Sequence, residues 1–416
     1  MSYRWPDRGA WPAVAPLVLA LLAPAAATAS EWVLGPRVSV SGTYDDNVTL
    51  NATDQTSASG VVVAPELLLR RNTEITRLDG RIALRLARYP GQDLADRDEG
   101  RFDVRARRRG ERSTWGINAL YRQDTTLRAA FDDISADEPG LDEPIADDPA
   151  LDDPDLGVFN VRVRRSRLDL SPRWEYALDP RTSVNAGYRF QSLSYGDHEA
   201  LDEGALRDSE RHRLHTGMAY ALTERTRLTG TLMVERLRVD DLDAQTDNYE
   251  LRAGFRHDLR ETLEASLEAG VRRTEFDVPE GDEGTSTGWV MDSGLAYRTD
   301  LMRIRGFLRR TVQQSFDGRA LETDRAEVRV SRDLTSKLEM VLGAHVLRAE
   351  ALSVDGTQPA RNYYEVEPQL RWSMTEEWSL ASSVRYRRNK PENGEAAESR
   401  ALFLGVTYEP RVITLR

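Results

Sequence analysis

Apolar and polar side chains alternate along much of this chain, and the segment "LTERTRLTGTLMVERLRVD" (222–240) shows the pattern clearly. From Leu228 the apolar side chains take every second position, through Leu232 and Val234, and polar residues such as Thr231 and Glu235 lie between them. A repeat of two residues is the period of a β-strand. The segment therefore predicts a strand with one apolar face and one polar, partly charged face.

The same alternation continues to the C-terminus, in segments separated in turn by short polar turns and longer hydrophilic loops. The short turns lie near residues 72, 110, 179, 223, 260, 300, 335 and 375. The longer loops cover 45–59, 90–100, 124–157, 196–209, 240–247, 277–287, 316–322, 351–361 and 389–398. Strict alternation of this kind is typical of outer-membrane barrels. The sequence predicts an all-β fold, a transmembrane antiparallel up-and-down β-barrel of about 18 strands, with 16 as the alternative.

Alternation alone does not separate a barrel from a soluble sandwich, propeller or solenoid, because each of these also has an apolar face and a polar face. Three features favour the barrel. The apolar rows extend over about nine to eleven residues, which is enough to cross a bilayer as a tilted strand. Aromatic residues such as Tyr220, Trp289 and Trp372 lie near row ends, as in interfacial girdles. Predicted helices are too few to cover such a long sheet or its edges.

The N-terminus differs from the rest of the chain. A basic start, an apolar run and small residues just before Ser30 predict a cleaved signal peptide over 1–29. Pro16 and Pro24 interrupt the apolar run, so an anchoring helix is the weaker interpretation. We therefore expect one barrel domain over 30–416, located in the cell outer membrane of a Gram-negative bacterium, with lipid as a partner.

Composition narrows the function classes further. The 416 residues carry 57 Lys and Arg against 69 Asp and Glu, giving a formal net charge of -12, and there is no cysteine. The acidic balance disfavours a nucleic-acid partner, whose phosphates would be repelled. The lack of cysteine excludes thiol catalysis and cysteine-based metal centres.

Arginines fall on the polar face of the predicted strands, and this face should line the barrel interior. Guanidinium groups suit carboxylate and phosphate, so the row predicts an aqueous conduit for anionic or hydroxylated solutes. The alternative is that each arginine pairs with an acid on a neighbouring strand and only solvates the interior. The candidate solute-contacting residues are Arg81, Arg85, Arg105, Arg107, Arg189, Arg213, Arg252, Arg256, Arg272, Arg305, Arg329, Arg371 and Arg385.

An acidic, proline-rich segment over 131–157 repeats an acid-acid-proline unit and is expected to be an extracellular loop. Its composition predicts a solvated, extended chain. Capture of divalent cations is the alternative, but the EF-hand ligand spacing is missing. We predict no metal site and no cofactor.

No catalytic motif is visible, and an enzyme is not expected. The nucleophile-elbow, zinc-protease and P-loop patterns are all missing. His212 and His215 differ by an odd number on one predicted strand, so they should point to opposite faces and could not share a metal.

The segment "SVSGTYDDNVTLNATD" (39–54) resembles the first strand of a family of porin-like outer-membrane barrels associated with exopolysaccharide and exosortase (PEP-CTERM) systems. The resemblance is carried by Tyr44, Asp45, Asp46 and Asn47, followed by "VVVAPELLLRRN" as the likeness of that family's second strand. It implies a role in the export or surface assembly of exopolysaccharide, with polysaccharide and periplasmic export machinery as partners. The final "EPRVITLR" departs from the usual aromatic end of such barrels.

Three functions remain open on the sequence alone. The leading prediction is an aqueous conduit involved in polysaccharide export or surface assembly. The alternatives are a general diffusion porin for small anionic solutes, and a non-conducting structural or adhesive surface barrel.

Overall fold

The computed structural model describes residues 31–92, 96–126, 163–196, 206–239, 244–277, 284–314, 320–352, 361–391 and 394–415. The predicted signal peptide and the acidic segment 131–157 lie outside these residues. Almost every described residue belongs to a strand or to the turn between two strands.

The chain forms nineteen strands, most of them 13 to 15 residues long. They are β1 (Trp32–Asp45), β2 (Ala58–Asn72), β3 (Thr76–Arg88), β4 (Arg97–Arg109), β5 (Ser113–Thr125), β6 (Arg164–Ala177), β7 (Thr182–Tyr195), β8 (Ser209–Ala221), β9 (Thr226–Val239), β10 (Ala244–Arg260), β11 (Leu263–Asp277), β12 (Gly284–Arg298), β13 (Met302–Gln314), β14 (Ala320–Asp333), β15 (Leu338–Ala351), β16 (Arg361–Ser373), β17 (Trp378–Pro391), β18 (Ala397–Tyr408) and β19 (Ile413–Leu415).

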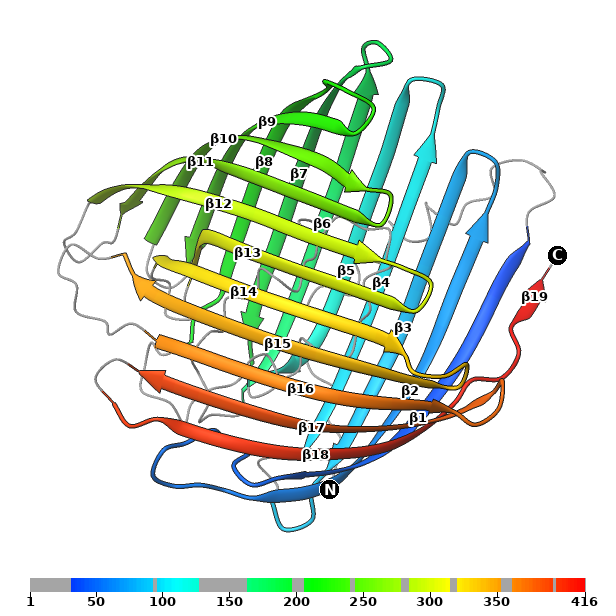
Figure 1. Ribbon diagram of the computed structural model, residues 1–416. Helices are drawn as coiled ribbons and strands as arrows, with labels where there is room; N and C mark the ends of the chain where they lie inside the picture. The colour runs from blue at the N-terminus through cyan, green and yellow to red at the C-terminus, as the bar shows by residue number, and fades with distance from the viewer. Residues whose placement is uncertain are drawn as a thin grey trace.

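The first eighteen strands close into one antiparallel barrel (Figure 1). Each strand pairs with the next along the chain, and β1 pairs with both β2 and β18, from Val38–Tyr408 to Asp45–Ala401. The short β19 continues this edge, because it pairs with the first residues of β1. The predicted all-β barrel is confirmed, and its strand number is 18 rather than 16.

One ladder is incomplete. Strands β12 and β13 pair from Met291–Arg310 to Arg298–Arg303, whereas β12 pairs with β11 as far as Gly284. The outer end of β13 pairs with β14 up to Gln314. Within these described strands, β12 and β13 therefore separate at the long-loop end of the barrel.

Five of the eight short turns share one local mechanism. At the first turn position a side-chain oxygen accepts a hydrogen bond from the backbone N–H three residues further on, at 2.9 to 3.1 Å. Thr73, Thr299, Thr335 and Thr375 supply a hydroxyl and Asp179 supplies a carboxylate. Such turns fix the chain reversal locally, so they keep each hairpin in register.

The two faces of the wall differ as the alternation predicts. In β9, Leu232 is 55% exposed on the outside, whereas Glu235 is 6% exposed on the inside. Residues paired directly across a ladder share a face, so this arrangement passes from strand to strand around the barrel. Apolar side chains cover the exterior and polar, charged side chains cover the interior. None of the described residues forms a helix long and apolar enough to cross a membrane.

Candidate functional site

The arginines named as candidates for solute contact lie at inward-facing positions of their strands. Arg81 and Arg85, for example, alternate with Ile82 and Leu84, which are exposed on the outside. Ladder pairing places the remaining candidates on the same face, namely Arg105, Arg107, Arg189, Arg213, Arg252, Arg256, Arg272, Arg305, Arg329, Arg371 and Arg385. One closed surface thus collects side chains from nearly the whole length of the chain. Whether they contact a solute stays a prediction.

Many of these arginines are paired with acids of the same wall. The shortest nitrogen–oxygen distances are 2.6 to 2.9 Å, for the pairs Arg81–Glu66, Arg189–Asp169, Arg213–Glu235 and Arg385–Glu367. Arg252 pairs with Glu250, Arg256 with Glu264 at 3.3 Å, and Arg371 with Glu339 at 3.5 Å. Cross-strand ion pairing therefore accounts for much of the interior arginine, as the alternative interpretation expects.

Arg272 behaves differently from the others. Its guanidinium is 1% exposed and reaches Glu322 of β14 at 2.7 Å, although β12 and β13 lie between the two strands. A second bond joins it to the Thr274 hydroxyl at 3.0 Å. Arg272 thus ties the wall together beside the place where β12 and β13 separate.

Like charges also face one another directly across several ladders. Arg101, Arg122 and Arg167 form one row over β4, β5 and β6. Arg305 and Arg329 pair across β13 and β14. Two equal charges in this position destabilise a sheet unless anions lie close to them. Acids of the wall lie close to this row, since Asp103 is 3.0 Å from Arg101 and Asp169 is 3.7 Å from Arg167.

Burial divides the interior into two halves. At the long-loop end, the Arg165 guanidinium is 0% exposed and donates from Nε and Nη2 to the two Asp124 oxygens, both at 2.8 Å. At the short-turn end, Arg77 and Arg256 keep 59% and 47% of their side chains exposed. The interior is packed toward the long loops and open toward the short turns.

The residues that carry the family resemblance join the first loop to the closing strand. Asp45 Oδ2 accepts a hydrogen bond from Arg387 Nη2 at 2.5 Å, and Asp45 Oδ1 accepts from the Ser399 hydroxyl at 2.8 Å. The same Oδ1 accepts from the Asn47 backbone N–H at 2.9 Å. Arg387 and Ser399 belong to β17 and β18, so Asp45 links three strands at the ladder where the barrel closes.

Asp46 and Asn47 extend this link into the loop. The Asp46 carboxylate accepts from the Arg400 backbone N–H at 2.7 Å. Asn47 Nδ2 donates to the carbonyl oxygens of Asn51 and Glu398 at 2.8 and 2.9 Å. Tyr44, by contrast, lies on the outside and is 50% exposed. The four residues therefore do not meet around one ligand; three hold the first loop and the fourth faces outward.

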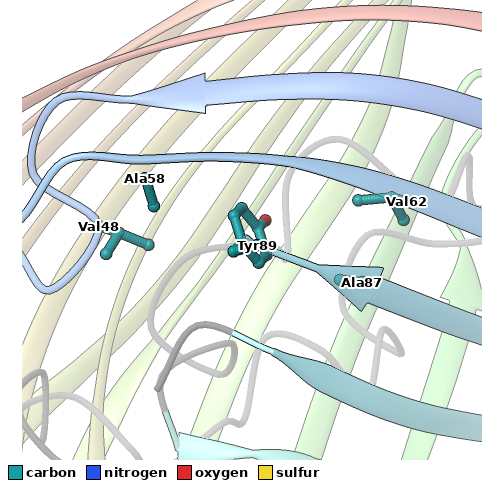
Figure 2. Close-up of a cluster of buried hydrophobic side chains, with 5 residues drawn as sticks. All are labelled: Val48, Ala58, Val62, Ala87 and Tyr89. Carbon is teal, nitrogen blue, oxygen red and sulfur yellow. The ribbon is translucent and has the colours of Figure 1, made fainter. Parts of the chain in front are cut away.

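Apolar side chains fix the first loop, residues 46–57, against the inner wall on both sides of β1. Val48 packs with Ala58, Val62, Ala87 and Tyr89 (Figure 2). Figure 2 shows Val48 on the loop after β1 and the Tyr89 ring between β2 and the end of β3.

On the other side of β1, Leu50 packs with Leu347, Tyr363 and Ala397 of β15, β16 and β18. Its backbone φ of 49° lies in the left-handed region that leucine rarely adopts. This packing keeps the strained residue in place. The first loop thus covers the inner side of the closing ladder and narrows the interior there.

Sequence reasoning does not identify three buried arginines of the inner wall: Arg165, Arg167 and Arg387. Arg165 and Arg167 follow Val163, which is apolar and yet faces inward, where it packs with Leu193 and Leu206. The alternation rule assigns apolar residues to the outer face. Applied to Val163, it would therefore place Arg165 and Arg167 on the outside, which is the wrong face. A signal does exist, because Arg165, Arg167 and Asp169 take every second position along β6, but it can be used only if the start of the strand is known.

The two neighbouring histidines lie on opposite faces. His212 is on the outside, where its Nδ1 lies 2.7 Å from the Tyr188 hydroxyl. His215 is on the inside, with its ring over Gly187 of β7. They do not converge on one ligand.

No protein-family model matches the sequence, and no curated protein matches it. Among solved structures the chain is similar to OpdQ of Pseudomonas aeruginosa, with 11% identity, 94% of this chain and 100% of that chain covered, and a TM-score of 0.45. It is also similar to OpdK of the same organism with vanillate (12% identity, 92% and 99% covered, TM-score 0.45) and to OccAB2 of Acinetobacter baumannii (10% identity, 91% and 98% covered, TM-score 0.46). Likeness this distant carries no information on solute or partner.

Proposed function

We propose that the protein is an outer-membrane channel for small anionic solutes. The observation that carries the proposal is the direct facing of like-charged arginines across the inner wall, as in the row Arg101–Arg122–Arg167 and the pair Arg305–Arg329. An apolar exterior and a charged interior suit a barrel that meets hydrocarbon outside and water inside. Short turns then face the periplasm and long loops face the medium.

The wall offers anions a series of exchangeable partners. Arg256 and Arg371 each have an acid of the wall at 3.3 to 3.5 Å and keep more than a third of their side chains exposed. A carboxylate in transit competes with that acid for the guanidinium and is released to the next arginine when the acid returns. Each exchange replaces one ion pair by another, so the guanidinium keeps an anionic partner throughout, while the displaced acid of the wall is solvated by water in the open half of the interior.

Reversal potentials in planar bilayers test the proposal. The wild-type protein should pass anions in preference to cations, and Arg305→Gln with Arg329→Gln should move the permeability ratio toward one. The matched control is Arg108→Gln with Arg332→Gln, which removes the same charge from outward-facing positions. A cation-selective wild type, or an equal effect of both double variants, would contradict anion conduction.

A non-conducting surface barrel is the second candidate, and the buried interior at the long-loop end favours it. Bilayers with protein present but no conductance steps would support this candidate over the first.

A role in polysaccharide export is supported by the resemblance around Tyr44, Asp45, Asp46 and Asn47. The same resemblance is the reason for proposing polysaccharide and periplasmic export machinery as partners. Loss of surface polysaccharide on deletion of the gene, with restoration by the wild-type copy, would support export over solute uptake.

A further inference from the structure

The wall of the barrel is not closed by backbone hydrogen bonds along its whole length. Residues 284–290 of β12 pair with β11 but not with β13, and residues 311–314 of β13 pair with β14 but not with β12. We call this place the split. It begins at the long-loop edge of the outer apolar band, where Trp289 and Leu308 are 50 and 51% exposed. With the long loops in the medium, the split lies beside the outer leaflet of the membrane.

Side chains, and not backbone bonds, close the split. Val290 is 0% exposed and Val312 is 5% exposed, although Val312 lies two residues after the outward-facing Arg310. On the outer side the Arg310 guanidinium covers the Trp289 ring, at 4.2 Å from the ring centre. The wall is thus apolar within the split and cationic at its outer side.

An acid of the wall is held between two arginines at the split. Glu322 Oε2 accepts a hydrogen bond from Arg272 Nη2 at 2.7 Å, and Glu322 Oε1 is 3.6 Å from Arg310 Nη1. Arg272 belongs to the inner face of β11, whereas Arg310 belongs to the outer face of β13. One carboxylate therefore connects the inner face of the wall with its outer face.

Arg272 has an unused donor on the same edge of its guanidinium. Its Nε is buried and has no hydrogen-bond partner among the described residues, and its side chain is 1% exposed. Nε and Nη2 form one edge that suits the two oxygens of a carboxylate, and Arg165 uses this edge fully with Asp124. Glu322 engages only Nη2. Because a buried donor without a partner costs free energy, a carboxylate that reaches both nitrogens binds Arg272 better than Glu322 does.

We propose that the split is a lateral port for an amphiphilic carboxylate, an apolar chain with one anionic end, which passes from the outer leaflet to the interior. Its carboxylate replaces Glu322 at Arg272 and engages both Nε and Nη2, while Glu322 stays with Arg310. Its apolar chain lies along Val290 and Val312. The proposal rests on the channel function and extends it from solutes of the medium to solutes dissolved in the membrane.

Block of single-channel current in planar bilayers tests the proposal, with octanoate, decanoate and dodecanoate as probes. At one aqueous concentration the association rate of the block should rise about fourfold per added methylene, because the concentration in the lipid rises by that factor. Acetate, which stays in the water, should not block at that concentration. An association rate that does not depend on chain length would mean that the probe enters from the water, and it would overturn the lateral port.

Two substitutions at the split should change the affinity for dodecanoate in opposite directions. Arg272→Lys keeps the charge but loses the two-point edge, so the affinity should fall about tenfold. Glu322→Gln removes the competing carboxylate, so the affinity should rise about tenfold. The matched controls are Arg273→Lys and Glu275→Gln, which alter an exposed ion pair at 2.8 Å on the outer face of β11. Both should leave the affinity unchanged.

A fall of affinity in both Arg272→Lys and Glu322→Gln would give these residues a structural role only, and effects of the same size in the controls would also overturn the proposal. Heat-modifiable migration in gels shows that each variant has folded, and the chain-length series needs no variant. A normal ion current that dodecanoate does not block would contradict the port alone. An absence of any ion current would contradict the channel function, and the port with it.

Discussion

Single residues inside this barrel differ widely in what their charge contributes, and burial decides the difference. Arg165 and Asp124 form a two-point ion pair that is almost fully buried, at 0 and 1% exposure. Arg236 and Asp247 form a similar pair on the outside, with 47 and 15% exposure. The same chemistry therefore occurs both in the packed interior and on the more exposed outer face.

Asp124→Asn should destabilise the folded barrel by about 3–5 kcal/mol, because it removes the negative charge that is bound at two points to a buried guanidinium. Asp247→Asn is the control and should cost about 1 kcal/mol or less, since that pair is partly solvated. Urea titrations of the protein in lipid vesicles, followed by tryptophan fluorescence, measure both values. Equal losses of unfolding free energy in the two variants would show that burial does not determine how much such an ion pair contributes to stability.

Asp179 provides a pH-dependent contribution in a turn outside the strands. Hydrogen bonds from the Arg181 backbone N–H and from Thr182 lower the pKa of its carboxyl group below the usual value. A depressed pKa in the folded state means that this carboxylate stabilises the fold above about pH 4, the unfolded value, and that the contribution disappears as the pH falls through the folded pKa. The stability difference between the wild type and Asp179→Asn should therefore shrink in acid. Thr335→Val, in the equivalent turn, should show no such pH dependence.

The parity of most interior arginines could be predicted from the sequence, because an arginine between two outward apolar residues has no other face to occupy. Arg85, between Leu84 and Leu86, and Arg329, between Val328 and Val330, illustrate this. Arg165 could not be assigned, because Val163 and Leu193 are apolar and face inward. Packing against chain that is distant in the sequence overrides alternation there, and alternation is the signal on which the prediction depends.

At the scale of elements, the first loop and the closing ladder form one unit. The side-chain amide of Asn47 connects the loop to β18, because its nitrogen donates to the Glu398 carbonyl oxygen. The same amide holds Asn51, donating from Nδ2 to the Asn51 carbonyl oxygen and accepting at Oδ1 from the Asn51 backbone N–H. The motif around Tyr44 is visible in the sequence as a resemblance, but its physical role is not. That role depends on Glu398 and Ser399, which lie about 350 residues further along the chain.

Asn47→Ala should weaken docking of the first loop by about 2 kcal/mol, because three side-chain hydrogen bonds are lost. A less firmly held loop leaves a wider interior beside β1, so single-channel conductance should rise. Thr53→Ala, at an exposed position of the same loop, should leave conductance unchanged. A fall in conductance for Asn47→Ala would mean that the docked loop does not narrow the passage.

Glycine sets the close approach of β10 and β11. A Cβ at Gly270 would lie 2.0 Å from the Leu251 carbonyl oxygen and 2.8 Å from the Arg252 Cα, and one at Gly254 would lie 2.3 Å from the Leu267 carbonyl oxygen. Backbone atoms cannot move aside cheaply. These two glycines therefore let the wall bend sharply.

Gly270→Ala should reduce the yield of folded barrel and destabilise it by about 1–3 kcal/mol through overpacking. The control is Gly230→Ala, because a Cβ there meets nothing within 4 Å. Heat-modifiable migration in gels reports the folded fraction of each variant. Full folding of Gly270→Ala at wild-type stability would argue against a tight bend at this position.

For the whole molecule, the sequence predicts the barrel architecture well, but it does not predict which part of the barrel interior is packed. Period-two alternation and the regular turns specify a closed barrel, because both are properties of neighbouring residues. The packing of Leu50 against Leu347 and Tyr363 joins segments far apart in the chain. Alternation cannot report such contacts, so the packed half of the interior emerges only in three dimensions.

Charge is unevenly distributed in the molecule, since an acidic chain encloses facing arginines such as Arg305 and Arg329. Anion selectivity should therefore depend on ionic strength. It should be strongest near 0.1 M salt and decline toward 1 M, as the screening length falls from about 10 Å to about 3 Å. Reversal potentials at a fixed salt gradient and increasing mean concentration measure the trend. An anion selectivity that does not change with salt concentration would indicate that pore size, and not charge, separates the ions.

The incomplete ladder between β12 and β13 gives the wall a mechanical division. Together with the ladder between β1 and β18, which ends at Val38–Tyr408, it separates a panel of twelve strands from a panel of six. Fewer backbone hydrogen bonds resist rotation at these two lines than elsewhere, so slow breathing of the barrel should hinge along them. Arg272, bonded to Glu322 across one hinge, acts as a tether that limits how far the panels part.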